Sequence, residues 1–349
     1  MRLGLAVDYT DDFATAVEVV RGGERAGVDL VAVAEAYSFD AVSRLGYLAA
    51  VTDRVALAAT ILGAFTRTPA TLAMTAAGLD DVSGGRFELG LGASGPQVVE
   101  GFHGVPFVAP LARLRETVEV CRTIWRREPA VLDGTAVHVP LPADQGTGLG
   151  KPLALVNTPR RDRIPVSIAA LTPRSVAQTA EIAEGWLPAF FHPERADAVW
   201  GRALAEGAAR RDPGLGPLDV HVVVPLAVGR GPVVQVALAA HRARLALYVG
   251  GMGARHKNFY AELAAGFGYA EAAAEVQGRF LAGDRTGAAA AVPADLVAAT
   301  SLIGDEGAVR DGLAALEAAG VTTVTVHPAG ASAADRIAQV EAVRALLPA

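Results

Sequence analysis

Two short segments near opposite ends of the chain have almost the same pattern, and this pattern limits the fold more than any other feature. They are Glu24–Val33 and Glu317–Val326, and Glu181–Leu187 is a looser third copy. Each contains the end of a helix, a glycine where a helix commonly stops, and a short turn into an apolar strand. This is the joint of a repeating unit in which parallel strands alternate with helices. We therefore expect an α/β fold whose parallel sheet is covered by helices.

The same alternation of apolar runs and helix-period segments continues along the chain. Eight such units close a (β/α)8 barrel, which is the fold that we predict. An open, doubly wound sheet is the alternative, but its phosphate fingerprint GxGxxG is absent after the first strand, where Asp8–Asp12 stands. The predicted strands are Leu3–Val7, Leu30–Ala34, Val55–Leu62, Arg86–Leu91, Val166–Ala170, Trp186–Phe190, Val220–Val228 and Val321–Val326. The predicted helices are Asp12–Ala26, Ser38–Val51, Pro69–Asp81, Leu111–Arg126, Pro173–Glu184, Glu194–Arg211, Glu306–Ala319 and Ala333–Leu347.

Two segments do not follow the alternation, and we interpret them as insertions in one barrel domain that spans residues 1–349. Residues 128–163 are rich in Pro, Gly and Asp and include a hairpin-like stretch at 131–137. Residues 232–299 contain more helix than one crossover requires. The insertions are therefore expected after the fourth and the seventh strand of the barrel. With 52% hydrophobic residues, the chain has enough apolar side chains for a large core.

Charge, cysteine content and hydropathy indicate a cytoplasmic protein that acts on a small molecule. The formal net charge is −6 without a basic run, so neither nucleic acid nor a membrane surface is expected as a partner. Cys121 is the only cysteine, which excludes an intrachain disulfide and a cysteine-based zinc site. No stretch approaches the roughly 20 apolar residues of a membrane span.

In a barrel of this kind the active site lies where the strands end, so the residues just after each apolar run are the candidates. Few acids or bases stand there: Asp8, Glu35 and two distant histidines, His192 and His327. A metal site is therefore not expected. A nucleophile elbow GxSxG is also missing. A site poor in acid–base groups is typical of a protein whose reactive atoms belong to a bound cofactor.

Two strand ends have features of a phosphate or ligand site. Thr172 is placed to cap the helix that begins at Pro173, so that free N–H groups face the strand ends, with Arg174 close by. The other interpretation is an ordinary capped helix. The glycines of Gly90–Gly95 would let the backbone approach a ligand, or they merely mark a narrow layer of the barrel.

Several motifs together resemble the luciferase-like monooxygenase superfamily, and most of all its branch that uses the deazaflavin coenzyme F420. They occur in the order and at the spacing of that superfamily. The matching segments are Gly27–Asp29, Ile61–Leu62, Thr66–Pro69, Ser83–Phe87, Leu89–Pro96, Val99–Gly104 and Gly307–Arg310.

The resemblance implies a (β/α)8 barrel that binds a flavin or deazaflavin at the strand ends, and commonly a homodimer. Members carry a non-proline cis peptide after the third strand, which here falls at Thr60–Ile61 or Ile61–Leu62. The implied cofactor-binding residues are Asp8, Thr60, Ile61, Leu62, Ala93, Ser94, Gly95, Ala170, Leu171, Thr172 and Arg174.

The expected reaction is hydride transfer between reduced F420 and an activated C=C or C=N bond, or its reverse. An FMN-dependent monooxygenase is the first alternative, and a non-catalytic flavin-binding or deazaflavin-binding protein is the second. Sugar-phosphate dehydrogenases of this superfamily place an Asp-His pair after the second strand, where this chain has Glu35-Ala36. That reaction is therefore not expected. An acidic residue usual after the fourth strand is also missing at Gly95, although Glu100 is near.

Three side chains are candidates for moving a proton. Glu35 is either a general acid, a hydrogen-bond partner of the cofactor, or a cap on the next helix. Tyr37 either donates to a substrate carbonyl or packs at the rim. His103 either acts in the loop over the site or is a surface histidine without a role. Asp8 either orients the pocket or caps the first helix, and residues 249–253 and 257–260 are expected to form a lid or rim.

Overall fold

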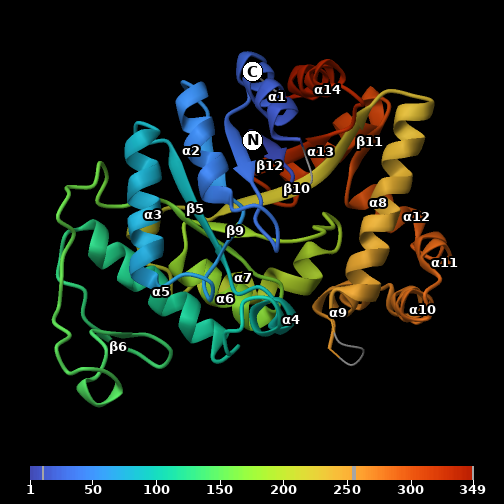
Figure 1. Ribbon diagram of the computed structural model, residues 1–349. Coiled ribbons are helices and arrows are strands. Elements are labelled where there is room, and N and C mark those ends of the chain that lie inside the picture. Colours follow the sequence, from blue (N-terminus) through green and yellow to red (C-terminus); the bar gives the residue numbers. More distant parts are fainter. Residues whose placement is uncertain (10–11, 254–256, 348–349) are drawn as a thin grey trace.

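The predicted barrel is confirmed by the computed structural model, which describes residues 1–9, 12–253 and 257–347. Eight parallel strands close into a cylinder, and helices surround it (Figure 1). These strands are β1 (Arg2–Val7), β2 (Leu30–Val33), β3 (Ala56–Ala59), β5 (Phe87–Gly92), β8 (Val166–Ala169), β9 (Gly185–Leu187), β10 (Asp219–Val228) and β12 (Thr323–Pro328).

The register of the strand pairs shows how the cylinder closes. β1 pairs with β2 on one side, with Gly4 opposite Leu30, and with β12 on the other, with Arg2 opposite Thr323. β9 pairs with β10, where Gly185 lies opposite Asp219. The first and last strands of the chain are therefore neighbours, and the carboxyl ends of all eight strands open on one face.

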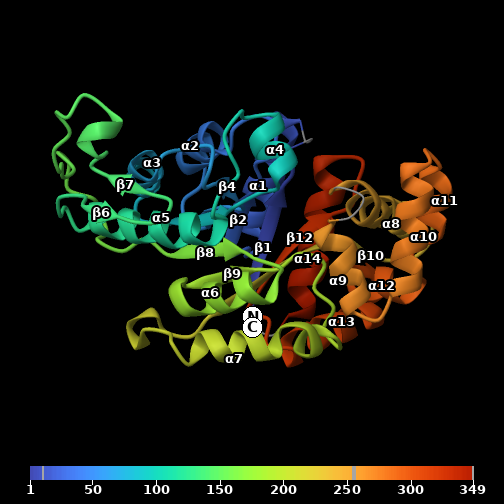
Figure 2. The same cartoon turned by 90° about the horizontal axis from the view of Figure 1, so that it is seen from below.

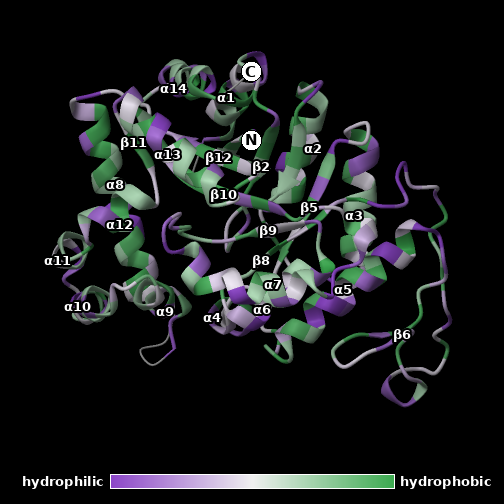
Figure 3. Cartoon of the chain, turned by 180° about the vertical axis from the view of Figure 1, so that it is seen from behind, coloured by the Kyte–Doolittle hydropathy of each residue, from purple (hydrophilic) through white to green (hydrophobic). Residues whose placement is uncertain are grey.

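The outer layer consists of helices that pack their apolar side chains against the barrel. Figure 3 shows apolar strands inside and many hydrophilic residues on the outer turns. The helices that precede the second insertion are α1 (Phe13–Arg25), α2 (Ala41–Val51), α3 (Pro69–Val82), α4 (Pro96–Gly101), α5 (Pro110–Trp125), α6 (Pro173–Ile182) and α7 (Arg202–Ala208). The last two helices are α13 (Glu306–Ala318) and α14 (Ala333–Leu346). Among the described residues, none of the helices combines the length and apolarity needed to cross a membrane.

The two irregular segments form the two additions at opposite sides of the molecule in Figure 2. Residues 128–163 contain a small antiparallel hairpin, β6 (Leu132–Asp133) and β7 (His138–Val139), which confirms the predicted hairpin. Both carboxylate oxygens of Glu116 on α5 accept backbone N–H bonds of 2.7–2.8 Å from residues 135–137 and hold this hairpin. The second segment forms α8 (Pro232–Gly251), α9 (Phe259–Gly266), α10 (Ala270–Leu281), α11 (Arg285–Ala290) and α12 (Ala294–Ala299).

Several predicted element boundaries were wrong. The run Val55–Leu62 is divided into β3 and β4 (Leu62–Gly63), because a cis peptide bond joins Thr60 and Ile61. The second helix begins at Ala41 and not at Ser38, because the Asp40 carboxylate caps it through the backbone N–H of Ser43 at 2.9 Å. The strand predicted at Trp186–Phe190 ends at Leu187, and α4 and the short strand β11 (Leu302–Gly304) were not predicted.

Polar side chains fill the amino-terminal end of the barrel interior. Arg2 pairs with Glu88 at 2.7 Å across the barrel. One layer above, the buried imidazole of His221 lies 2.7 Å (Nε2) from the hydroxyl of Thr325. Gly4 leaves room for this layer, since a Cβ there would lie 2.0 Å from the Thr325 hydroxyl oxygen. These groups occupy one another, so the end of the barrel with the strand carboxyl termini remains the place for a ligand.

Candidate active site

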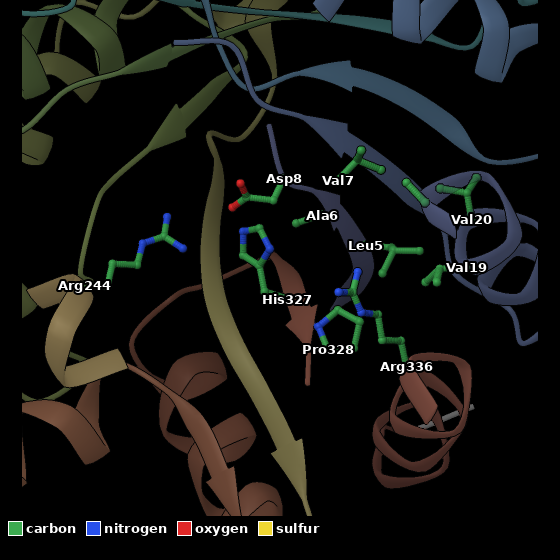
Figure 4. Close-up of a pocket in the computed structure, with 11 residues that line it drawn as sticks. Leu5, Ala6, Val7, Asp8, Val19, Val20, Arg244, His327, Pro328 and Arg336 are labelled. Atoms are coloured by element: carbon green, nitrogen blue, oxygen red, sulfur yellow. The ribbon is translucent and has the colours of Figure 1, made fainter. Parts of the chain in front are cut away.

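A cavity of about 230 Å³ lies at the carboxyl ends of β1 and β12. Asp8 and His327 follow the inner faces of these two strands, and Arg244 projects toward them from α8 (Figure 4). The cavity continues between β1 and helices α1 and α14, where Val20 and Arg336 line it. Asp8, a predicted site residue, therefore lies in a cavity. Residues 10 and 11, which follow it in the sequence, are outside the described part of the chain.

Asp8 is held in place from the neighbouring unit. Its backbone carbonyl accepts a hydrogen bond of 3.0 Å from the guanidinium of Arg44 on α2. Arg44 is buried, and its guanidinium lies over the rings of Phe13 and Phe39 at 5.4 and 5.6 Å. Such stacking fixes the guanidinium plane. Sequence reasoning missed Arg44, since an arginine inside a helix has no pattern that distinguishes it from a solvent-exposed one.

Glu35, the candidate acid after β2, is bound on every side. Its carboxylate accepts hydrogen bonds of 2.6 and 2.9 Å from both terminal nitrogens of Arg67. It also accepts a bond of 2.9 Å from the backbone N–H of Ala41, the first residue of α2. The predicted capping role is therefore confirmed. Arg67 belongs to the loop after β4, so the pair ties two strand-end loops together.

The cis peptide bond implied by the resemblance is present at Thr60–Ile61, the first of the two predicted positions. It places Ile61 beside the inner face of β5. A Cβ at Gly90 would lie 2.0 Å from the backbone oxygen of Ala59, and one at Gly92 would lie 2.6 Å from the Ile61 side chain. These two glycines are therefore required by the packing of the neighbouring strand. Leu62, the third predicted residue here, is fully buried in the core.

After β5 the backbone itself faces the opening of the barrel. Ala93 and Gly95 are half-buried, and Ser94 between them is exposed with a φ of 61°, in the left-handed region. Helix α4 begins at the next residue. The sequence prediction of a backbone-rich strand end is thus confirmed for residues 93–95.

The turn after β8 leads into a capped helix, as predicted. The Thr172 hydroxyl oxygen accepts the backbone N–H of Ser175 at 3.3 Å, and Pro173 is the first residue of α6. Arg174 is exposed, Ala170 is buried and Leu171 is half-buried. The remaining N–H groups of the first turn of α6 open toward the strand ends, where an anion would be stabilised.

Tyr37 and His103 lie at the rim, in two different loops. The ring of Phe102 lies between them, with centroids 6.1 Å from Tyr37 and 5.0 Å from His103. Tyr37 is 56% exposed and Phe102 is 65% exposed. The two predicted proton donors are therefore brought into one accessible patch next to the opening.

An aromatic cluster on the other side of the opening was largely missed by the sequence analysis. Tyr9 shares a hydrogen bond with Tyr248, and the rings of Tyr248 and Tyr260 pack edge to face at 4.8 Å. Phe190, with a φ of 49°, packs against both at 5.1 and 5.9 Å. The chain has 6 tyrosines, and three of them meet here. Tyr260 belongs to the segment predicted as a lid or rim, but nothing in the spacing links it to Tyr9.

Burial sets the protonation of this cluster. It raises the pKa of Tyr9 to about 12, helped by the neighbouring Tyr248 and Asp8. Burial likewise raises the pKa of Tyr260 far above its ordinary value. Both phenols are therefore protonated at neutral pH. The described residues contain no group of three His, Cys, Asp or Glu side chains arranged to hold a metal ion.

Comparison with known proteins agrees with the fold and the motifs. Residues 1–323 match the family model of the luciferase-like monooxygenases. A protein of Mycobacterium tuberculosis named "Putative coenzyme F420-dependent oxidoreductase" is 40% identical over 329 residues, which cover 93% of this chain and 94% of that relative.

Two solved structures have the same fold. The coenzyme F420-dependent tetrahydromethanopterin reductase from Methanopyrus kandleri has a TM-score of 0.79 and 23% identity, covering 98% of this chain and 97% of that one. An F420-dependent secondary alcohol dehydrogenase in complex with an F420–acetone adduct has a TM-score of 0.74 and 17% identity, with the same coverage. The chain is therefore an enzyme of the luciferase-like monooxygenase family.

Proposed function

We propose that this protein is an oxidoreductase that transfers a hydride between coenzyme F420 and an activated C=C or C=N bond of a small organic substrate, in either direction. The observation that carries this proposal is the 40% identity over 93% of the chain to the relative named for that coenzyme. The opening of the barrel supports it, because backbone and apolar side chains dominate there. Such a lining suits chemistry that a cofactor supplies.

The residues at the strand ends fit a flat ring with an anionic side chain. Thr60, Ile61, Leu62 and residues 93–95 would contact the ring, since glycine at 90 and 92 keeps β5 free of side chains beside Ile61. Ala170, Leu171 and Thr172 would hold a phosphate through the free N–H groups of α6, with the exposed guanidinium of Arg174 nearby. When bound, the coenzyme supplies a carbon that donates or accepts a hydride. The protein supplies binding and orientation.

Tyr37 and His103 are the proposed proton donors to the reduced bond. Both are accessible, and both contact Phe102 at the rim. Asp8 would orient the ligand from the opposite side. Glu35 accepts hydrogen bonds from three N–H groups, so the role that we assign to it is to position the loops after β2 and β4.

A binding titration tests the proposal. Purified protein is titrated with F420 and with FMN, and binding is followed by the absorbance and fluorescence of each cofactor. We expect tight binding of F420 alone, weakened roughly tenfold in Arg174→Met, since a charge-assisted contact is lost. Arg202→Met is the matched control, because its side chain is 93% exposed on the outside of α7.

Each other result changes the assignment. Tight binding of FMN without F420 would contradict the proposal and favour the FMN-dependent monooxygenase. Binding of F420 without turnover of any enone, imine or dehydroamino acid would favour a non-catalytic binding protein.

A further inference from the structure

The cavity at the ends of β1 and β12 has an excess of positive charge. The guanidinium groups of Arg244 and Arg336 and the imidazole of His327 line it, and Asp8 is the one carboxylate among its lining residues. The chain as a whole has a net charge of −6. The local charge is therefore opposite to that of the molecule, which attracts an anion to this place.

Arg244 is the group best placed to bind that anion. It comes from α8, and its guanidinium points toward Asp8 and His327 across the cavity (Figure 4). The Tyr248 ring supports it from behind, with the guanidinium carbon 5.8 Å from the ring centroid. Within the described part of the chain, Arg244 forms no ion pair with a carboxylate. Its N–H groups, which match the two oxygens of a carboxylate or phosphate, are therefore not used by a protein carboxylate.

The wall next to Arg244 suits a planar group. Tyr248, Tyr260 and Phe190 form it, and their rings pack edge to face. A ligand that combines an unsaturated or aromatic part with an anionic oxygen group would place the first against this wall and the second on the guanidinium.

We propose that Arg244 binds an anionic oxygen group of the substrate, so that the enzyme acts on small unsaturated carboxylates or phosphates in preference to neutral analogues. This inference rests on the function proposed above. The coenzyme's own acidic side chain is a second source of the same chemistry. The N-terminus of α6, which we assign to the coenzyme, follows β8, four strands away from β1 around the barrel. The anion at Arg244 therefore belongs to a different group.

Binding of benzoate and of its neutral analogue benzamide tests the proposal. Both are titrated by calorimetry into the protein with and without F420. We expect benzoate to bind roughly tenfold or more tightly than benzamide, a preference that Arg244→Met abolishes and Arg244→Lys partly retains. Arg202→Met, which removes the same charge from an exposed position, should keep the full preference. Unchanged melting temperatures show that the variants fold.

A second titration identifies the source of the anion. F420 is compared with a deazaflavin that lacks the phosphate-bearing and carboxylate-bearing side chain. If Arg244→Met weakens only the binding of complete F420 and leaves the benzoate preference intact, the substrate assignment is overturned. Equal binding of benzoate and benzamide to the wild-type protein overturns it as well. A benzoate preference without any binding of F420 would instead support Arg244 as the anion site and contradict the proposed coenzyme.

Discussion

At the scale of single residues, the side chains around the opening of the barrel differ in whether the protein already uses their polar groups. Glu35 is bound to Arg67 and to the start of α2. The hydroxyl of Thr172 is used in capping α6. Arg244 and Asp8, in contrast, point into a cavity. The sequence identified residues at strand ends, but it contains no information on which partners tertiary packing brings to them.

Glu35→Gln should lower the free energy of unfolding by about 1–3 kcal/mol, because the bonds to a charged guanidinium are weakened and one of them loses its acceptor. Arg67→Met should reproduce this loss and any accompanying loss of activity, since both changes break the same pair. Urea denaturation and steady-state kinetics measure the two effects, with the exposed Glu18→Gln as a control. A fall in kcat of a hundredfold or more in Glu35→Gln alone would instead support a general acid.

Stability should fall as the pH decreases from about 6.5 to about 4, because of two buried histidines. Burial lowers the pKa of His221 to about 4 and that of His241 to about 4. In the unfolded chain these groups bind protons already near pH 6.5, so acid favours unfolding. Above that pH both states are neutral and the contribution vanishes. Each histidine contributes on the order of 3 kcal/mol by pH 4.

Urea titrations of wild-type protein and His241→Gln at several pH values measure this effect. The variant should have a weaker dependence of stability on pH in this range. The exposed His103→Gln is the control and should retain the wild-type slope. An identical slope in all three proteins would show that the buried imidazole does not control the acid limb.

At the scale of elements, the contact between the loop after β3 and strand β5 shows what a sequence pattern can and cannot predict. The glycines at 90 and 92 were visible, and their position at a strand end was predicted correctly. Their cause was not visible, because it lies in the backbone of Ala59 and the side chain of Ile61 on the adjacent strand. The cis bond at Thr60–Ile61 has no compositional signal, and only the family resemblance placed it.

Gly90→Ala should destabilise the protein by about 3 kcal/mol or more, because the backbone oxygen in its way cannot move independently. Gly92→Ala should cost about 1–3 kcal/mol, since the obstacle is the end of the Ile61 side chain. Ile61→Val in the Gly92→Ala background should recover part of that loss. Gly46→Ala in α2, where nothing lies within 4 Å, is the control and should be stabilising. Equal effects at 90 and 46 would refute the packing argument.

At the scale of the whole molecule, the order of strands and helices was predicted well, because strands buried on both faces must be continuously apolar. All four residues of β2 are buried, for example. Short elements and strand ends were predicted poorly. β11 has three residues, and β9 stops before the apolar residues Phe190 and Phe191, which instead turn into the site and the core.

We expect residues 1–349 to unfold as one domain. Leu245 and Val276 of the second insertion and Val137 of the first belong to the same continuous hydrophobic core as the barrel residues Leu5 and Leu57. Differential scanning calorimetry should therefore show a single transition, with calorimetric and van't Hoff enthalpies that agree. Two separated transitions, one of which disappears when an insertion is cleaved by protease, would show that the insertion is a separate folding unit.

The helical insertion that begins with α8 also has an evolutionary consequence. The strand ends that would hold the coenzyme belong to the barrel, whereas Arg244, Tyr248 and Tyr260 belong to the inserted helices. Mutations in the insertion can therefore change which compounds are accepted while leaving the redox machinery intact. Exchange of residues 232–299 between paralogues offers a direct way to transfer ligand preference, and it makes this barrel a suitable scaffold for directed evolution.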